Sequence, residues 1–305
     1  MQIGRLSVRM SRGYIYGVIA YGLWGLAPLY WPLVAPSSAL ETLAHRMVWS
    51  LFFLVIINLI LRNWGKIFEA MKNRKVMLLL LLAALAVTTN WGLYIWAVTN
   101  EHVIDSSLGY FINPLINVAL GIFVFSERLR KVQWIAIAIA AMGVLWLTIN
   151  AGSVPWIGLI LGFSFSIYGM LKKLAGLDGV ESLTIESIWV FPLALGYLIY
   201  LGVTSQLVFG SAGFSHTFFA VMAGLFTALP LLAFGAAAVR IPYSSMGILQ
   251  YLSPTIQFII GYFIVGETMT TERWIGYILV WVALTIFATD ALRRGLQSKS
   301  RTSTS

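Results

Sequence analysis

The feature that most limits what this chain can fold into is a succession of apolar runs, each about 20 residues long. A helix of about that length spans the hydrocarbon core of a bilayer. Cutting the chain at its charges and polar turns predicts ten such helices, at 13–34, 39–61, 76–99, 103–125, 132–149, 155–173, 182–202, 217–239, 242–265 and 274–291. We therefore expect an all-α membrane protein with ten transmembrane helices and no soluble domain.

Composition excludes several other classes of protein. Charged residues make up 10% of the chain and hydrophobic residues 59%, whereas soluble domains have about 25% charged residues. The net charge of +9 does not indicate nucleic-acid binding, because the basic residues lie in short clusters between apolar runs. The chain has no cysteine and three scattered histidines, and HExxH, GxSxG and phosphate-binding glycine motifs do not occur. We expect that the chain binds no metal and no cofactor and that it is not an enzyme.

The basic residues predict the orientation in the membrane. Of the 20 Lys and Arg residues, all except Arg46 and Arg273 fall on the membrane face that carries the N-terminus in a ten-helix topology. Lys172, Lys173 and Arg240 belong to this set. Since Lys and Arg concentrate in cytoplasmic loops, we expect both terminal tails, 1–12 and 292–305, to be cytoplasmic.

The chain contains an internal repeat. The stretch "SSLGYFINPLINVALGIFVFSERLRKVQWIA" aligns with "SSMGILQYLSPTIQFIIGYFIVGETMTTERWIG", with two extra residues in the second copy, so that Pro114 pairs with Pro254. A second block pairs "LETLAHRMVW" with "VESLTIESIW", and there Glu41 falls on Glu181. We expect a first five-helix repeat over 13–149 and a second over 155–291.

The odd number of helices in each copy predicts that the second repeat enters the membrane upside down. Inverted repeats commonly build a site at the bilayer midplane that opens alternately to each side. Transport is therefore the leading functional hypothesis from the residues alone.

Three ionisable residues, Glu41, His45 and Arg46, lie in the first two turns of the predicted helix 39–61. Glu41 and His45 are four residues apart and share a helix face, whereas Arg46 lies about 100 degrees round from His45. Two interpretations stay open. The residues are interfacial, with the glutamate at the positive helix end and the arginine reaching lipid headgroups, or they take part in substrate binding or gating.

In the alignment of the two repeat copies, Arg46 pairs with Glu186. We predict that each belongs to a gate on its own side of the membrane and closes through a charged or hydrogen-bonding partner. Coupling to protons requires a group in the pathway that titrates near neutral pH, and on the outer side only Glu41 and His45 qualify.

Polar, aromatic and proline residues also occur inside the predicted helices. Asn90 lies at mid-depth in a predicted membrane helix, where its amide requires a hydrogen-bonding partner on another helix or a cavity. Interhelical hydrogen bonding is the simpler alternative for it. The matched Pro114 and Pro254 predict kinks that line a pathway or merely adjust helix packing. Mid-helix rings that can face a cavity are Trp24, Trp91, Tyr94, Tyr168 and Tyr251.

The motifs "YGLWGLAPLYW", "ALETLAHRMVWS", "NWGLYIWAV", "SSLGYFINPL" and "LTIES" make the chain resemble a RarD-type member of the EamA family, within the drug/metabolite transporter superfamily. The resemblance covers residues 13–292. It implies two inverted five-helix repeats around a cavity in the bacterial inner membrane, with the second helix peripheral. It also implies a secondary carrier of small metabolites or drugs, and the group's chloramphenicol-sensitivity label makes chloramphenicol one candidate solute.

Carried onto this chain, the resemblance implies cavity-wall positions on helices 1, 3, 4, 6 and 9. These are Trp24, Tyr30, Asn90, Trp91, Tyr94, Asn113, Tyr168, Gln250 and Tyr251. Because the second helix is peripheral in that architecture, the resemblance favours a gate or a structural lock for Glu41, His45 and Arg46. The expected function is a secondary transporter, working as an exporter by alternating access. The alternative is a membrane sensor or scaffold that binds a solute without moving it.

Overall fold

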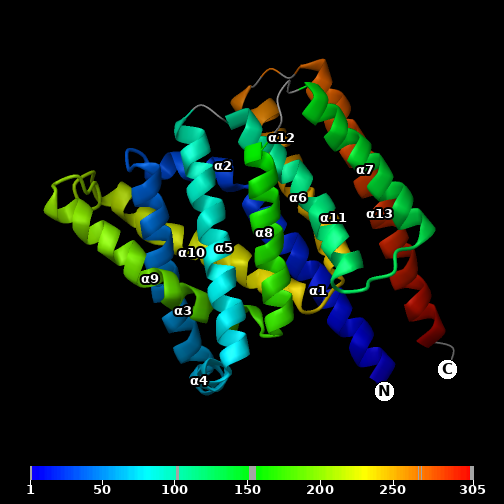
Figure 1. The fold of residues 1–305 in the computed structure, drawn as a ribbon, viewed down its shortest axis with the longest axis horizontal. Coiled ribbons are helices and arrows are strands. Elements are labelled where there is room, and N and C mark those ends of the chain that lie inside the picture. The colour runs from blue at the N-terminus through cyan, green and yellow to red at the C-terminus, as the bar shows by residue number, and fades with distance from the viewer. Residues whose placement is uncertain (1, 101–102, 151–155, 267, 269, 303–305) are drawn as a thin grey trace.

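The structure is a computed structural model that describes residues 2–100, 103–150, 156–266, 268 and 270–302 (Figure 1). The long helices are α1 (Gln2–Gly25), α3 (Ala39–Leu61), α5 (Arg74–Thr99), α6 (Val103–Phe123), α7 (Lys131–Asn150), α8 (Trp156–Ala175), α9 (Gly179–Val203), α10 (Phe214–Ala238) and α13 (Thr271–Thr302). Shorter elements are α2 (Ala27–Tyr30) with a 3-10 turn (Trp31–Val34), α4 (Trp64–Lys72), and a broken helix made of α11 (Tyr243–Gln250), α12 (Leu252–Ile259) and a π-helical turn (Ile260–Val265). The start of α1 and the end of α13 lie at the same end of the molecule.

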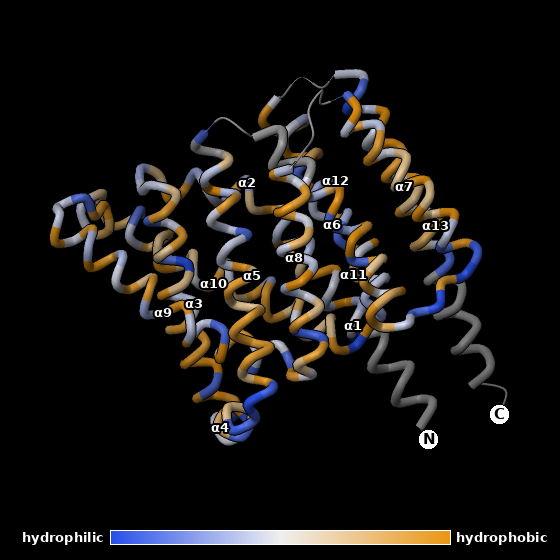
Figure 2. The backbone as a smooth tube through the Cα atoms, in the orientation of Figure 1, coloured by the Kyte–Doolittle hydropathy of each residue, from blue (hydrophilic) through white to orange (hydrophobic). Residues whose placement is uncertain are grey.

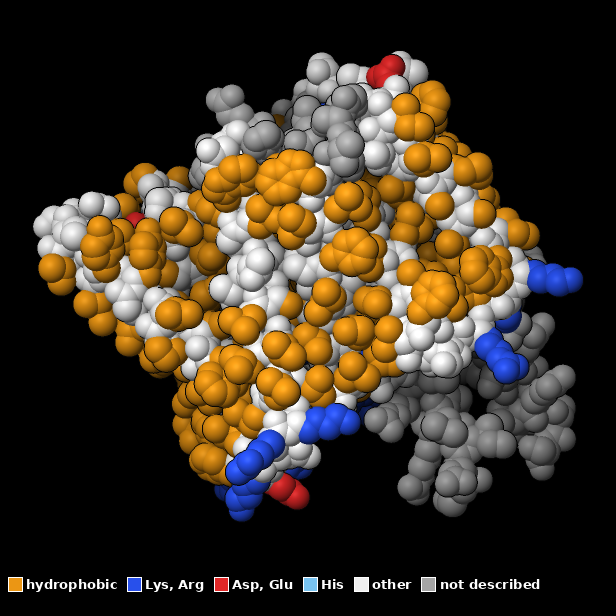
Figure 3. All heavy atoms as spheres, viewed as in Figure 1, with side chains coloured by type: hydrophobic (Ala, Val, Ile, Leu, Met, Phe, Trp, Pro, Cys, Tyr) orange, Lys and Arg blue, Asp and Glu red, His pale blue; other side chains and the backbone are white. Residues whose placement is uncertain are grey.

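The helices have the length and composition of membrane spans. Among the described residues, eight helices can cross a membrane, and the bent pair Arg12–Gly25 and Ala27–Val34 is a ninth span if counted as one. Hydrophobic residues run along the helices in Figure 2 and spread over the face of the molecule in Figure 3, where Lys and Arg side chains gather toward the end with the termini. The prediction of an all-helical, multi-pass membrane protein is confirmed. The helix α4 lies in a stretch for which the sequence predicted no helix.

Capping side chains and prolines set where the helices begin and bend. Ser38 caps α3 by accepting a hydrogen bond from the backbone N–H of Glu41 at 3.2 Å. The first span bends by 43° between α1 and α2, where Pro28 lacks a backbone donor. The α11–α12 helix is interrupted at Tyr251, and Pro254 leaves the Gln250 carbonyl without its usual helical donor. By contrast, α6 continues through Pro114.

Helix packing joins the first half of the chain to the second half. α3 packs against α9 and α10, α5 against α8 and α9, and α6 against α8 and α11. α1 packs against α10, α11 and α12, while α7 and α13 pair along one flank (Figure 1). Gly224 of α10 allows the closest approach to α3, because a Cβ atom there would lie 2.4 Å from the Trp49 backbone carbon. Small residues at such crossings are typical of helix packing in membranes.

Two glutamates link α3 and α9. One, on α3, binds the loop that follows α9, and the other, on α9, binds the segment that follows α3. The Glu41 carboxylate on α3 accepts hydrogen bonds from the backbone N–H groups of Val208 and Phe209, both at 3.0 Å, just after α9. The Glu181 carboxylate on α9 accepts a hydrogen bond from the Asn63 side chain at 2.7 Å, just after α3. The two contacts are reciprocal, since Glu41 and Glu181 align in the repeat.

Candidate functional site

A central cavity of about 210 Å³ lies in the half of the bundle away from the termini. Its walls come from the ends of α1, α2 and α5 and from the first halves of α3, α6 and α8, together with the α11–α12 break. Its aromatic lining consists of Tyr21, Trp24, Trp31, Trp91, Tyr94, Tyr110 and Phe165, and its amide lining of Asn90, Asn113, Gln250 and Gln257. Such a lining suits a solute with an apolar body and a few polar groups.

Arg46 is the one charged side chain among the described residues that line this cavity. Its Nε–H donates a hydrogen bond to Thr227 Oγ1 at 2.8 Å. Its guanidinium carbon lies 4.8 Å from the Trp31 ring centroid and 4.7 Å from that of Trp91, within cation–π range. In the described part of the chain no carboxylate forms an ion pair with it. The side chain therefore points into the bundle, toward α10 and the cavity.

The amides at the base of the cavity are held by other helices. The Asn90 amide nitrogen on α5 donates to the Leu161 carbonyl at 2.8 Å and to Ser164 Oγ at 2.9 Å, both on α8. The Asn113 amide nitrogen on α6 donates to Ser166 Oγ at 2.9 Å, also on α8. These bonds anchor α5 and α6 to α8, so Asn90 and Asn113 both join helices and form part of the wall.

Gln250 closes the base of the cavity from the other half of the chain. Its Oε1 accepts a hydrogen bond from the Asn117 amide nitrogen at 2.8 Å. This contact joins α6 to α11 at the level of the helix break, next to Pro254, which also lines the cavity.

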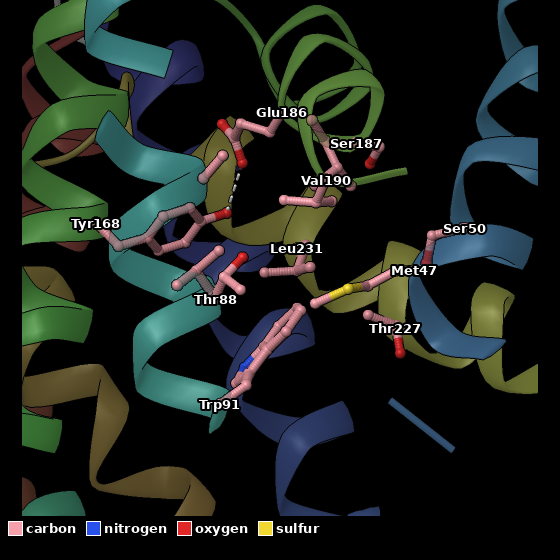
Figure 4. A pocket seen from close by; sticks show the side chains of 13 residues that line it. Met47, Ser50, Thr88, Trp91, Tyr168, Glu186, Ser187, Val190, Thr227 and Leu231 are labelled. Atoms are coloured by element: carbon pink, nitrogen blue, oxygen red, sulfur yellow. Dashed lines mark hydrogen bonds between the residues drawn. The ribbon is translucent and has the colours of Figure 1, made fainter. Parts of the chain in front are cut away.

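A second, smaller cavity of about 30 Å³ is lined by residues of α3, α5, α8, α9 and α10 (Figure 4). At its edge the Glu186 carboxylate of α9 forms an ion pair with Lys172 Nζ of α8 at 2.7 Å. The same carboxylate accepts a hydrogen bond from the Tyr168 hydroxyl at 3.1 Å. Tyr168, Lys172 and Glu186 are each at most 3% exposed. The Lys172–Glu186 pair is thus buried between α8 and α9, where the two opposite charges compensate each other.

Trp91 separates the two cavities. Its side chain lines both of them, and in Figure 4 it lies on the opposite side of the smaller cavity from Glu186. Thr227 lines the smaller cavity while it accepts the hydrogen bond from Arg46 in the larger one. The two cavities are therefore neighbours, and Trp91 and Thr227 form the partition between them.

Glu41 and His45 line neither cavity. His45 Nε2 is 3.7 Å from Glu41 Oε1, and Trp49 Nε1–H donates to His45 Nδ1 at 3.2 Å. The His45 ring packs on Phe209, with centroids 4.6 Å apart. Both side chains are therefore engaged with the loop that follows α9.

The structure brings together most of the residues that the sequence predicted for the cavity wall. Trp24, Asn90, Trp91, Tyr94, Asn113 and Gln250 line the larger cavity, and Tyr168 lines the smaller one. Tyr30 and Tyr251 are in neither lining. The Tyr30 hydroxyl donates to the Phe219 carbonyl at 2.6 Å, and the Tyr251 hydroxyl donates to the Phe111 carbonyl at 3.1 Å, so both rings serve packing between helices.

Two placements differ from what the sequence led us to expect. The α3 helix is not peripheral at Arg46, because α3 packs between α9 and α10 and directs this side chain into the larger cavity. The charge pattern predicts a cytoplasmic loop position for Lys172, but its side chain is buried against Glu186. Tyr168 and Lys172 are four residues apart on one face of α8, but this spacing does not indicate Glu186, which comes from α9.

A helical bundle that encloses a polar and aromatic cavity is typical of membrane carriers. A family model described as the EamA-like transporter family matches residues 11–149. Protein RarD of Streptomyces exfoliatus is 49% identical over 95% of this chain and 92% of its own length. Protein RarD of Escherichia coli (strain K12) is 37% identical over 92% of this chain and 95% of its own.

Two further comparisons agree. The uncharacterized transporter YojE of Bacillus subtilis (strain 168) is 39% identical over 95% of this chain and 98% of its own length. A solved crystal structure superposes with a TM-score of 0.69 over 93% of this chain and 98% of that chain, at 14% sequence identity, which concerns the fold alone. The chain belongs to the RarD proteins of the EamA-like transporter family. It is accordingly a membrane transporter for small molecules and not an enzyme.

Proposed function

We propose that this chain is a secondary transporter that moves a small metabolite or drug across the bacterial inner membrane by alternating access. The observation that carries the proposal is the difference between the two cavities on either side of Trp91. One has room for a solute, and the other is small and bordered by the Lys172–Glu186 ion pair. A carrier whose site is accessible from one side, and closed toward the other, has this arrangement.

The helix packing supports two inverted repeats, over 13–149 and 155–291. When the two halves are exchanged, the α5–α8 contact becomes the α1–α10 contact, and the α3–α10 contact becomes the α5–α9 contact. The reciprocal bonds of Glu41 and Glu181 to the opposite loops follow the same exchange. Ten membrane passes related in this way, with the halves rocking about Trp91, are the architecture that we propose.

The charge distribution supports cytoplasmic termini. Lys and Arg side chains gather at the end of the molecule with the termini in Figure 3, and cytoplasmic loops of membrane proteins are rich in them. In that orientation the larger cavity belongs to the outer half of the membrane and the Lys172–Glu186 pair to the inner half. We propose export as the direction of transport.

The proposed roles of the residues follow from their positions. Trp24, Asn90, Trp91, Tyr94, Asn113 and Gln250 form the solute-binding wall. Glu186, held by Lys172 and Tyr168, closes the inner side. Arg46, held by Thr227, belongs to the outer half of the pathway.

Proton coupling through Glu41 and His45 stays a prediction. Their contacts with Phe209 and the backbone of the loop after α9 support a structural lock in this conformation. A role in coupling requires that this loop moves during transport. The pH dependence of flux in a Glu41→Gln, His45→Gln double variant separates the two roles.

Flux into proteoliposomes tests the proposed function. The purified protein is reconstituted and offered amino acids, aromatic amines, chloramphenicol and nucleosides under an imposed pH gradient. Chloramphenicol is included because a relative from Pseudomonas aeruginosa, 31% identical to this chain, is named chloramphenicol-sensitive protein RarD. Saturable flux that is lost in Glu186→Ala and retained in Arg273→Gln, an exposed α13 substitution, is expected.

The alternative of a sensor or scaffold has a distinct signature in the same experiment. A compound that raises the unfolding temperature of the protein, but shows no saturable flux in either direction, would support binding without transport.

A further inference from the structure

We propose that the larger cavity recognises organic anions, and that Arg46 anchors the carboxylate of a small aromatic or flat apolar acid. The inference deepens the proposed transport function, because it names the class of solute. It rests on the hydrogen bonding of Arg46, on the charges of the cavity lining and on the rings around the guanidinium group.

The hydrogen bonds of Arg46 leave one edge of the guanidinium group available. Its Nε–H is taken by Thr227 Oγ1, which fixes the orientation of the planar group. The two terminal nitrogens, Nη1 and Nη2, make no hydrogen bond with any described residue. Two parallel N–H donors at this edge match the two oxygens of a carboxylate.

The charge of the cavity favours an anion over a cation. Among the described lining residues no aspartate, glutamate or lysine accompanies Arg46, so the lining carries a single positive charge. An unpaired charge within a membrane span is costly, and such groups are usually paired or functional. The Trp31 and Trp91 rings compensate it only in part. A bound carboxylate completes the compensation, whereas an ammonium group meets repulsion.

The remaining lining provides for the body of the solute. Trp24 and Phe165 lie edge to face, with centroids 5.6 Å apart, and offer apolar surface beside the amides. The Gln250 carbonyl oxygen is used by Asn117, which leaves its amide nitrogen facing a site that lacks acidic groups. The volume of about 210 Å³ is below the ~300–1,000 Å³ of pockets for drug-sized ligands, so a metabolite with one ring fits best.

Binding of three matched probes tests the inference. Phenylacetate, phenylacetamide and phenethylamine share one ring and differ in charge, and their dissociation constants are measured by calorimetry on the purified full-length protein at pH 7.5. We expect phenylacetate to bind about tenfold more tightly than phenylacetamide, with phenethylamine weakest. Arg46→Gln removes the preference for the acid, Arg46→Lys keeps part of it, and Arg273→Gln leaves it unchanged.

Several results overturn the anion site. These are equal or tighter binding of the amide or the amine, no binding of phenylacetate, or a preference for the acid that survives in Arg46→Gln. If Arg46→Gln does not fold, the comparison of the three probes on the parent protein decides alone. Flux of the same probes separates this inference from the transport proposal. Acid-selective binding without flux would support the anion site and contradict the transport proposal. Flux of the amine but not of the acid would support transport and contradict the anion site.

Discussion

Arg46 and Glu186 align in the sequences of the two proposed repeats, but their surroundings differ. Glu186 has a cation at 2.7 Å, a tyrosine hydroxyl at 3.1 Å and almost no exposure. Arg46 has a hydroxyl and two indole rings, no carboxylate among the described residues, and a cavity in front of it. The comparison teaches that the charge of Glu186 is compensated within the protein. The charge of Arg46 has no carboxylate partner among the described residues, and a solute can supply one. The predictions below perturb this asymmetry, from the largest expected effect to the smallest.

Removing one member of the buried pair has the largest expected effect. Lys172→Met leaves the Glu186 carboxylate buried without its cation, which costs about 3–5 kcal/mol of stability. The double variant Lys172→Met, Glu186→Gln removes both charges and should recover much of that loss. Thermal unfolding of detergent-solubilised protein measures both. If the single variant is as stable as the parent, the pair does not hold α8 to α9.

The contact between Glu41 and the loop that follows α9 has the second-largest expected effect. Glu41→Gln weakens two hydrogen bonds to the α9 loop, and bonds to charged groups contribute about 1.5–3 kcal/mol. We expect a lower unfolding temperature with an unchanged KM for transport, since Glu41 lines neither cavity. A large rise in KM with unchanged stability would place Glu41 in the solute pathway instead.

The partition is the third target. Trp91→Ala removes the ring that lines both cavities and one cation–π contact of Arg46, worth about 0.5–2 kcal/mol. Solute affinity should fall several-fold, and Trp91→Phe should retain part of it because an aromatic face remains. Calorimetric binding curves compare the two variants. Equal affinity in Trp91→Ala and the parent would argue against contact between this ring and the solute.

The orientation of Arg46 gives the smallest effect. Thr227→Val removes the acceptor of the Nε–H bond, and single interhelical bonds in membranes average about 0.6 kcal/mol. We expect KM to rise about threefold with little change in kcat or in unfolding temperature. Thr227→Ser, which keeps the hydroxyl, is the matched control and should behave like the parent.

The helices could be predicted from the sequence because an apolar run of about 20 residues is itself the physical requirement for a span. The start of α3 at Ala39 and its end at Leu61 were predicted to the residue. The amphipathic α4 was missed, since its nine residues carry no such run.

The site was harder to predict, because it depends on how helices from the two halves are rotated against each other. Polarity and depth left Asn90 open between a cavity and an interhelical hydrogen bond, and it was the family resemblance that implied cavity-wall positions for Asn90 and Trp91. The inward direction of Arg46 and the pairing of Lys172 with Glu186 depend on the packing of α3 with α10 and of α8 with α9, which local sequence does not encode. Tyr30 and Tyr251 fit the composition of a cavity wall, but their hydroxyls bond to neighbouring helices.

Side-specific labelling of single cysteines tests the central claim most directly, because the chain has no cysteine of its own. Ala27→Cys reports on the larger cavity and Ser187→Cys on the smaller one. A membrane-impermeant thiol reagent is applied from each side of oriented vesicles, with and without a transported solute. Alternating access predicts that Ala27→Cys reacts from the outside, that Ser187→Cys reacts only from the inside, and that solute changes the two rates in opposite directions. Reaction of both positions from the same side, or rates that rise and fall together, would contradict the account.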